Sequence, residues 1–130
     1  NDSKATNPES TLSALESFED PIHVLLCGND KQLALDDFIY DVHQLAASII
    51  TFGEIAPRLL EISQTLSPLF PIHHVNTVQD AIEYAMTISQ TGDIILLSPS
   101  SSSYDQFSGF EDRGTQFSDC VFNYASSLLV

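Results

Sequence analysis

The stretch PIHVLLCG, residues 21–28, decides the fold, because a short run of apolar residues stops there at a glycine. Such a run, bounded by turn-forming residues, is typical of a buried strand. SIITFG (48–53), PIHHV (71–75) and GDIILLS (92–98) repeat this pattern further along the chain. The sequence therefore predicts four short strands.

Helical patterns alternate with these strands. Asn7 is a favoured N-cap and Pro8 a favoured first helical residue, so a helix is predicted to begin there. Further helices are predicted over residues 36–47, 54–66, 76–89 and 112–127. The last one would have an apolar face formed by Phe117, Val121, Tyr124 and Leu128. This alternation predicts one α/β domain over residues 1–130, with a Rossmann-like, doubly wound, mostly parallel sheet and helices on both faces.

The composition suits one compact domain, since 43% of the 130 residues are hydrophobic. We expect neither a membrane span nor a signal peptide, because no apolar run approaches ~20 residues and no charged leader precedes one. Cys27 and Cys120 have no metal-type spacing and are too few for a disulfide scaffold, which favours free thiols in a reducing cytoplasm. The adjacent His73 and His74 would point to opposite faces of a strand, so no metal site is expected.

The charge is strongly acidic, with 18 acids against four bases and a formal net charge of −14. Such a surface repels a phosphate backbone, so nucleic acid is not an expected partner. The scarcity of bases makes Lys4, Lys31, Arg58 and Arg113 informative. Arg58 lies within a helical pattern and is interpreted as an ordinary surface residue.

Two strand ends are rich in polar residues, and ligands of open parallel sheets bind beyond the carboxyl ends of strands. CGNDK (27–31) places Lys31 in a turn, where it would meet an anionic ligand or simply face solvent. SPSSSSYDQF (98–107) offers hydroxyls and backbone N–H groups to a carboxylate. It has no G-x-S-x-G elbow, and the sequence has no G-x-x-x-x-G-K-[ST] phosphate loop.

NDSKATN, at the start of the sequence, places Asp2, Lys4 and Thr6 at alternate positions. In an extended segment these side chains would share a face. An acid, a base and a hydroxyl together suit a nucleotide or phosphate site. The alternative is a solvated segment with ordinary capping residues.

NDSKATN, LLCGNDK and the long motif S-P-x-x-x-S-x-D-Q-F-x-x-F-x-x-R-G follow one another in an order that resembles the C-terminal domain of the bacterial Mur ligases. The resemblance covers nearly the whole chain. It is greatest to the members that add D-glutamate to UDP-N-acetylmuramoyl-L-alanine in peptidoglycan synthesis. It implies an ATP-dependent amide ligase, acting through an acyl phosphate, of which this chain is the third domain. The missing central domain would bind most of the ATP and Mg²⁺, and the whole enzyme would be a cytoplasmic monomer without nucleic-acid or membrane partners.

The same resemblance implies roles for particular residues. ATP contacts are implied for Asp2 at the ribose and for Lys4 at the reacting phosphate and carboxylate. Tyr104 would line either the edge of the nucleotide site or the D-glutamate pocket. D-Glutamate contacts are implied for Thr6, Lys31, Ser103 and Phe110.

Two departures from the family pattern affect loop geometry: Cys27 replaces a usual glycine, and Ser100 and Ser101 replace other small residues. Asp105 and Arg113 are expected to pair at the base of the loop. The alternatives are another Mur or folylpolyglutamate-type ligase, which would differ at the amino-acid pocket, and a non-catalytic α/β binding module. A receiver-like module is disfavoured, because the first two strand ends offer only Asp30 and Glu54 as acids.

Overall fold

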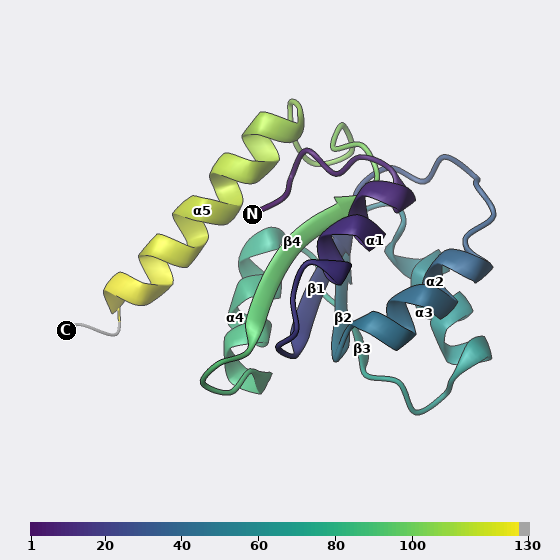
Figure 1. Cartoon of the computed structure of the whole chain (residues 1–130). Helices are drawn as coiled ribbons and strands as arrows, with labels where there is room; N and C mark the ends of the chain where they lie inside the picture. Colours follow the sequence, from purple (N-terminus) through teal and green to yellow (C-terminus); the bar gives the residue numbers. More distant parts are fainter. Residues whose placement is uncertain (128–130) are drawn as a thin grey trace.

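The computed structural model describes residues 1–127 and confirms the predicted α/β architecture (Figure 1). Leu128, predicted on the apolar face of the last helix, lies outside the described residues. In chain order the elements are α1 (Pro8–Glu16), β1 (Ile22–Cys27), α2 (Asp36–Leu45), β2 (Ser48–Phe52), α3 (Ala56–Leu66), β3 (Ile72–His74), α4 (Val78–Ile88), β4 (Ile94–Ser100) and α5 (Phe110–Ser127).

The four strands form a parallel sheet in the order β3-β2-β1-β4. Every residue of β1 and β2 is buried, which explains why these two strands consist of apolar runs rather than alternating patterns. The chain moves from β1 to β2 and β3 on one side, then returns to place β4 on the other side. The strand order therefore switches between β1 and β4, which is where ligands of such sheets bind.

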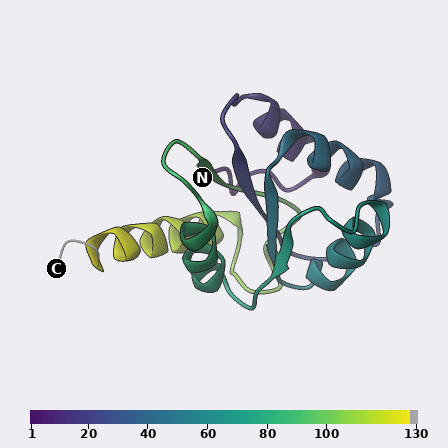
Figure 2. The same ribbon diagram turned by 90° about the horizontal axis from the view of Figure 1, so that it is seen from below.

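Helices cover both faces of the sheet (Figures 1 and 2). Because successive strand side chains point to opposite faces, Val24 and Leu26 pack on one side of β1 and Leu25 and Cys27 on the other. The first core includes residues of α1, α2 and α3, and the second includes residues of α4 and α5. The doubly wound arrangement is confirmed.

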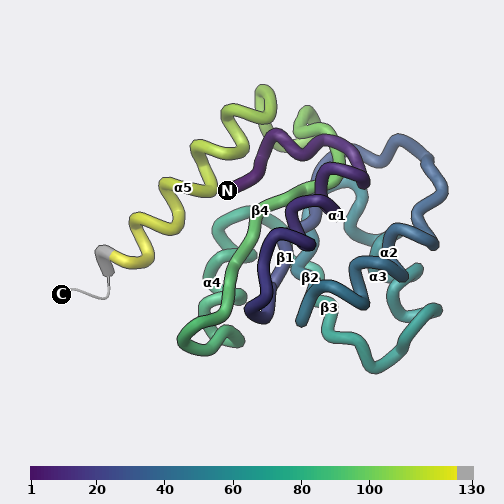
Figure 3. The backbone as a smooth tube through the Cα atoms, viewed as in Figure 1, coloured from purple at the N-terminus to yellow at the C-terminus, as the bar shows by residue number. Residues whose placement is uncertain are grey.

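The segment before α1 lies beside the outer edge of β4 (Figure 3). The Asp2 N–H donates to the Leu97 carbonyl at 2.6 Å, and the Ser100 N–H donates to the Ala5 carbonyl at 2.9 Å. This pairing accompanies a strand that continues to Ser100, two residues beyond the predicted end at Ser98.

Two helix starts test the boundary predictions. The predicted start of α1 is confirmed, since the Asn7 side chain accepts a hydrogen bond from the Ser10 N–H at 2.9 Å. The last helix begins at Phe110 rather than at the predicted Asp112. The Arg113 N–H already donates to the Gly109 carbonyl at 3.1 Å, which closes the first helical turn two residues early.

Both cysteines are free thiols, and the adjacent pair of histidines lies at the surface. Cys27 is a buried free thiol and Cys120 a half-buried one. Burial raises the pKa of Cys27 to about 12, although the nearby Arg113 opposes this shift. His73 and His74 are exposed. Among residues 1–127 no group of histidine, cysteine, aspartate and glutamate side chains is placed to hold a metal ion, and no helix there has the length and apolarity of a bilayer span.

Candidate functional site

The loops after β1 and β4 are fastened to each other by Asn29. Its backbone N–H donates to the Ser102 carbonyl at 2.8 Å, and its side-chain oxygen accepts from the Tyr104 N–H at 2.8 Å. The Ser101 hydroxyl donates to the Asn29 carbonyl. Sequence reasoning missed Asn29, although an asparagine directly after a glycine is a common turn signal.

Gly28 allows the two loops to approach so closely. Its φ of +116° lies in a region that L residues rarely adopt, and a Cβ atom there would collide with the Ser102 carbonyl oxygen. Cys27, which replaces a usual glycine of the resembled family, points instead into the core beneath α4 and α5. Its side chain is therefore accommodated in that core.

A small cavity of about 50 Å³, here called the Lys31 cavity, lies where the order of strands switches. Its lining includes Thr6, Lys31, Arg58, Ser100 and Ser101. Two of the residues predicted to bind D-glutamate, Thr6 and Lys31, are thus brought together from the segment before α1 and the loop after β1. The two serines in this lining, Ser100 and Ser101, were not predicted to contact the substrate.

Ser103, Phe110 and Tyr104 do not line the Lys31 cavity. Ser103 is only 1% exposed, whereas Tyr104 is 73% exposed. Phe110 begins α5 and lines a different cavity of about 470 Å³, which also includes Lys4.

Arg58 is not the ordinary surface residue that the sequence suggested. Its Nη1 donates to Asp30 Oδ1 at 2.7 Å, and its Nη2 donates to the Leu33 carbonyl. These two acceptors lie on either side of Lys31 in the loop after β1. The helical pattern around Arg58 gave no sign of this role, because the partners belong to a distant loop.

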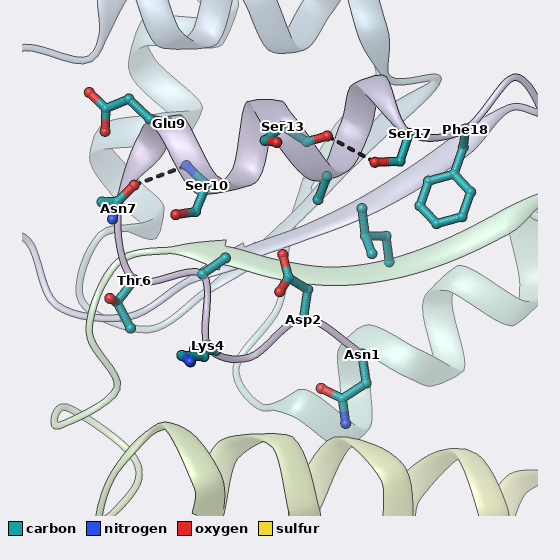
Figure 4. A pocket seen from close by; sticks show the side chains of 13 residues that line it. Asn1, Asp2, Lys4, Thr6, Asn7, Glu9, Ser10, Ser13, Ser17 and Phe18 are labelled. Atoms are coloured by element: carbon teal, nitrogen blue, oxygen red, sulfur yellow. Dashed lines mark hydrogen bonds between the residues drawn. The ribbon is translucent and has the colours of Figure 1, made fainter.

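Asp2, Lys4 and Thr6 all line a wide cavity of about 900 Å³ between the N-terminal segment and α1 (Figure 4). The extended segment predicted for them is wrong, because the Ala5 N–H donates to the Asp2 carbonyl at 2.9 Å and closes a turn. Figure 4 shows the Asp2 carboxylate pointing toward α1 and Lys4 lying well away from it. Asp2 Oδ2 accepts from the Ser98 hydroxyl at 2.8 Å.

The side chains of Asp2 and Lys4 are chemically suited to part of an ATP molecule, the group that the family resemblance implies. A carboxylate beside hydroxyls suits ribose, and the exposed ammonium of Lys4 suits one charged oxygen. A single ammonium does not neutralise a triphosphate, so the donor set fits the sugar and the reacting phosphate rather than the whole phosphate chain.

Asp105 and Arg113 do not form the predicted close ion pair, although the Asp105 charge lies near enough to oppose the lowering of the Arg113 pKa by burial. Within residues 1–127 they form no ion pair; Asp105 Oδ2 instead accepts from the Glu54 N–H at 2.9 Å. Arg113 is fully buried, which lowers its pKa, and it donates to the Ser3 hydroxyl at 3.1 Å and to the Ser3 carbonyl at 2.9 Å. Arg113 therefore supports the segment that bears Lys4.

The chain is similar to known proteins over most of its length. Residues 1–101 match the family described as "Mur ligase, glutamate ligase domain". Proteins named UDP-N-acetylmuramoylalanine--D-glutamate ligase are 40% identical in Bacillus subtilis and 44% identical in Bacillus mycoides, each over 93% of this chain. The protein of that name in Clostridioides difficile is 36% identical over 95% of the chain. The chain spans only 26 to 27% of the length of these relatives.

Proposed function

The chain belongs to the Mur ligase family, as a glutamate ligase domain, and on this basis we propose that it is the C-terminal domain of a longer ATP-dependent ligase. That ligase would join D-glutamate to UDP-N-acetylmuramoyl-L-alanine, as the names of its relatives suggest. The free thiols of Cys27 and Cys120 suit a reducing cytoplasm. The share of the relatives that the chain spans supports a protein with further domains.

The observation on which the proposal rests is the joint placement of Thr6 and Lys31 in the Lys31 cavity, at the switch in strand order. D-Glutamate has two carboxylates. An ammonium and a hydroxyl in the lining of one cavity are suited to one of them, because hydrogen bonds to charged groups are stronger than neutral ones.

The second carboxylate is proposed to contact Ser103 and the backbone near Phe110, at the start of α5. Ser103 is buried in the present arrangement. A direct contact therefore requires the loop over residues 101–109 to adjust when the amino acid binds. Tyr104, exposed on the same loop, would line the pocket or the nucleotide edge.

Asp2 and Lys4 would serve the ATP side of the site. ATP supplies the phosphoryl group that activates the carboxylate of the UDP-sugar substrate. Asp2 would accept a hydrogen bond from a ribose hydroxyl, and Lys4 would stabilise negative charge that develops on the reacting oxygens. The triphosphate and Mg²⁺ would be held chiefly by the central domain of the ligase.

The test is an assay of the full-length ligase that contains this chain. Phosphate release is measured with ATP, Mg²⁺ and UDP-N-acetylmuramoyl-L-alanine, with D-glutamate, L-lysine or D-Ala-D-Ala added as acceptor. We expect release to depend on D-glutamate. Activity that depends on L-lysine or D-Ala-D-Ala instead would assign the domain to a different ligase and reject the proposal.

A further inference from the structure

Arg58, which lines the Lys31 cavity, holds the loop that bears Lys31. It extends from the first turn of α3 and donates from Nη1 to Asp30 Oδ1 at 2.7 Å and from Nη2 to the Leu33 carbonyl. Asp30 directly precedes Lys31, and Leu33 follows it by two residues. One guanidinium therefore binds the loop on both sides of the lysine.

Asp30 is itself held from several directions. Its N–H donates to Glu54 Oε1 at 2.8 Å, while its Oδ1 accepts from the Gln32 N–H at 2.9 Å as well as from Arg58. The carboxylate thus joins the residue after Lys31 to the helix that follows β2. Its side chain is 11% exposed, whereas the contacts with Glu54 and Gln32 lie at the exposed surface of the loop.

The backbone at this place is strained. Gln32 (φ 61°) and Ser100 (φ 69°) are the two non-glycine residues with positive φ among residues 1–127. Ser100 lines the Lys31 cavity, and Gln32 is the neighbour of Lys31. Non-glycine residues in left-handed conformations cost free energy and persist where the surroundings fix them, often at functional sites. Here the surroundings of Gln32 are Asp30 and, through it, Arg58.

We propose that Arg58 is a positioning residue for the amino-acid substrate: it fixes the strained loop so that the Lys31 ammonium faces the carboxylate bound in the Lys31 cavity. This inference rests on the proposed function. It adds a residue of α3 to a site otherwise built from the N-terminal segment and the loops after β1 and β4.

Arg58 acts through the loop rather than by touching the substrate. Although Arg58 also lines the Lys31 cavity, Nη1 and Nη2 each donate to a loop acceptor, so the two described hydrogen bonds of its guanidinium go to the loop. Its side chain is 29% exposed, and partly exposed ion pairs add little to overall stability. Losing Arg58 therefore affects the loop much more than the folded state of the domain.

The experiment uses steady-state kinetics of the full-length ligase at saturating ATP and UDP-sugar. Arg58→Ala is expected to raise the KM for D-glutamate about tenfold, while kcat and the KM for ATP stay within about twofold of wild type. Arg58→Lys is expected not to restore the KM, because an ammonium lacks the planar fork that reaches both acceptors. Gln64→Ala, an exposed change on the same helix, is the matched control and should change neither constant.

The variant Asp30→Asn distinguishes positioning of the loop by Arg58 from direct binding of the substrate by Arg58. If Arg58 works through Asp30, this variant also raises the KM for D-glutamate, and combining it with Arg58→Ala adds little further. If Arg58 bound the substrate itself, freeing it from Asp30 would leave the KM unchanged or lower it, and the proposal would be overturned.

Two further outcomes are decisive. An Arg58→Ala enzyme with a wild-type KM, or with a reduced kcat and an unchanged KM, would show that Arg58 is only structural. A wild-type ligase that does not use D-glutamate would reject the proposed function itself. The wild-type assay thus distinguishes rejection of the proposed function from rejection of the positioning role of Arg58.

Discussion

Lys31 is the single residue on which binding of the amino acid should depend most. Lys31→Ala in the full-length ligase should raise the KM for D-glutamate by about ten- to a hundredfold, since a hydrogen bond to a charged group contributes ~1.5–3 kcal/mol. The KM for ATP should stay nearly constant. Kinetics with each substrate varied in turn measure both values, and an equal rise in the two would place Lys31 outside the amino-acid pocket.

Lys4 should affect the chemical step more than binding. A donor that stabilises charge in the transition state is worth ~2.7–4 kcal/mol, so Lys4→Ala should lower kcat by roughly a hundred- to a thousandfold. D-Glutamate binding, followed by isothermal titration of the full-length ligase, should weaken much less. A near-normal kcat would show that Lys4 is an ordinary exposed base.

At the scale of single residues, the sequence indicated positions better than contacts. Thr6 and Lys31 were named from the family resemblance of their motifs, and both line one cavity; their role in binding stays a prediction. The partners of Arg58 and Arg113 could not be predicted, because each lies far away in the sequence. Burial of Arg113 is a result of tertiary packing, and an eight-residue spacing to Asp105 contains no information about it.

Substitution of Gly28 tests the close contact between the loops after β1 and β4. Gly28→Ala should destabilise the domain by roughly 2–5 kcal/mol, the sum of an unfavourable φ and a collision with the Ser102 carbonyl. Gly92→Ala is a matched control, since φ there is +96° but no atom lies within 4 Å of the added Cβ. It should cost only about 1–2 kcal/mol. Urea unfolding of both variants gives the comparison; equal losses would mean that the collision is relieved.

The opposite end of the sheet is joined by a polar trio that the motif search did not predict. His23 Nε2 lies 2.9 Å from Asp93 Oδ2, and His23 Nδ1 lies 2.6 Å from the Ser48 hydroxyl. With neutral His23, Asp93 accepts from Nε2–H and Ser48 donates to Nδ1. The trio thereby links the starts of β1 and β2 to the turn before β4.

Low pH should weaken the contact between His23 and Asp93. The Gln90 backbone N–H, followed by His23, lowers the pKa of Asp93 below its usual value. A depressed carboxyl pKa contributes stability above the unfolded-state value, and that contribution is lost as the pH falls through the folded-state value. The difference in unfolding free energy between wild type and Asp93→Asn should therefore shrink below about pH 4. If the difference in unfolding free energy did not change with pH, the charge of Asp93 would not contribute to stability through this contact.

Element types were predictable, whereas several element ends were not. Apolar runs that stop at glycine indicated β1 and β2, whose complete burial makes the pattern continuous. The end of β4 was missed, because pairing of Ser100 with Ala5 involves a segment almost a hundred residues away. The early start of α5 was missed as well: the hydrogen bond from the Arg113 N–H to the Gly109 carbonyl already closes a turn before Asp112.

For the whole molecule, the chain by itself should fold but neither hydrolyse ATP nor form the amide bond. The sequence contains no phosphate loop, and phosphoryl transfer depends on a cradle for the triphosphate and its metal ion. Circular dichroism and a phosphate-release assay of the purified chain test this. ATP hydrolysis that disappears in Lys4→Ala would show that these residues suffice for catalysis.

The distribution of charge over the molecule also follows from the fold. Against 18 acids, three of the four bases line cavities at the carboxyl end of the sheet: Lys4, Lys31 and Arg58. The fourth, Arg113, is buried beneath the segment that bears Lys4. Asp2, Asp30, Glu54 and Asp105 lie at the same end, and Arg58 is paired with Asp30, so the bases offset part of the acidic charge there.

The pairing of the N-terminal segment with β4 has a consequence for self-association. An unpaired strand edge is a template on which another chain can add a strand. Residues 2 to 5 occupy that edge through Leu97 and Ser100, at the end of the sheet where the site lies. A chain shortened to begin at Asn7 would lose Asp2 and Lys4 and would also leave these backbone groups open to a neighbouring molecule. We therefore expect the segment proposed to handle ATP also to limit self-association of the domain through the edge of β4.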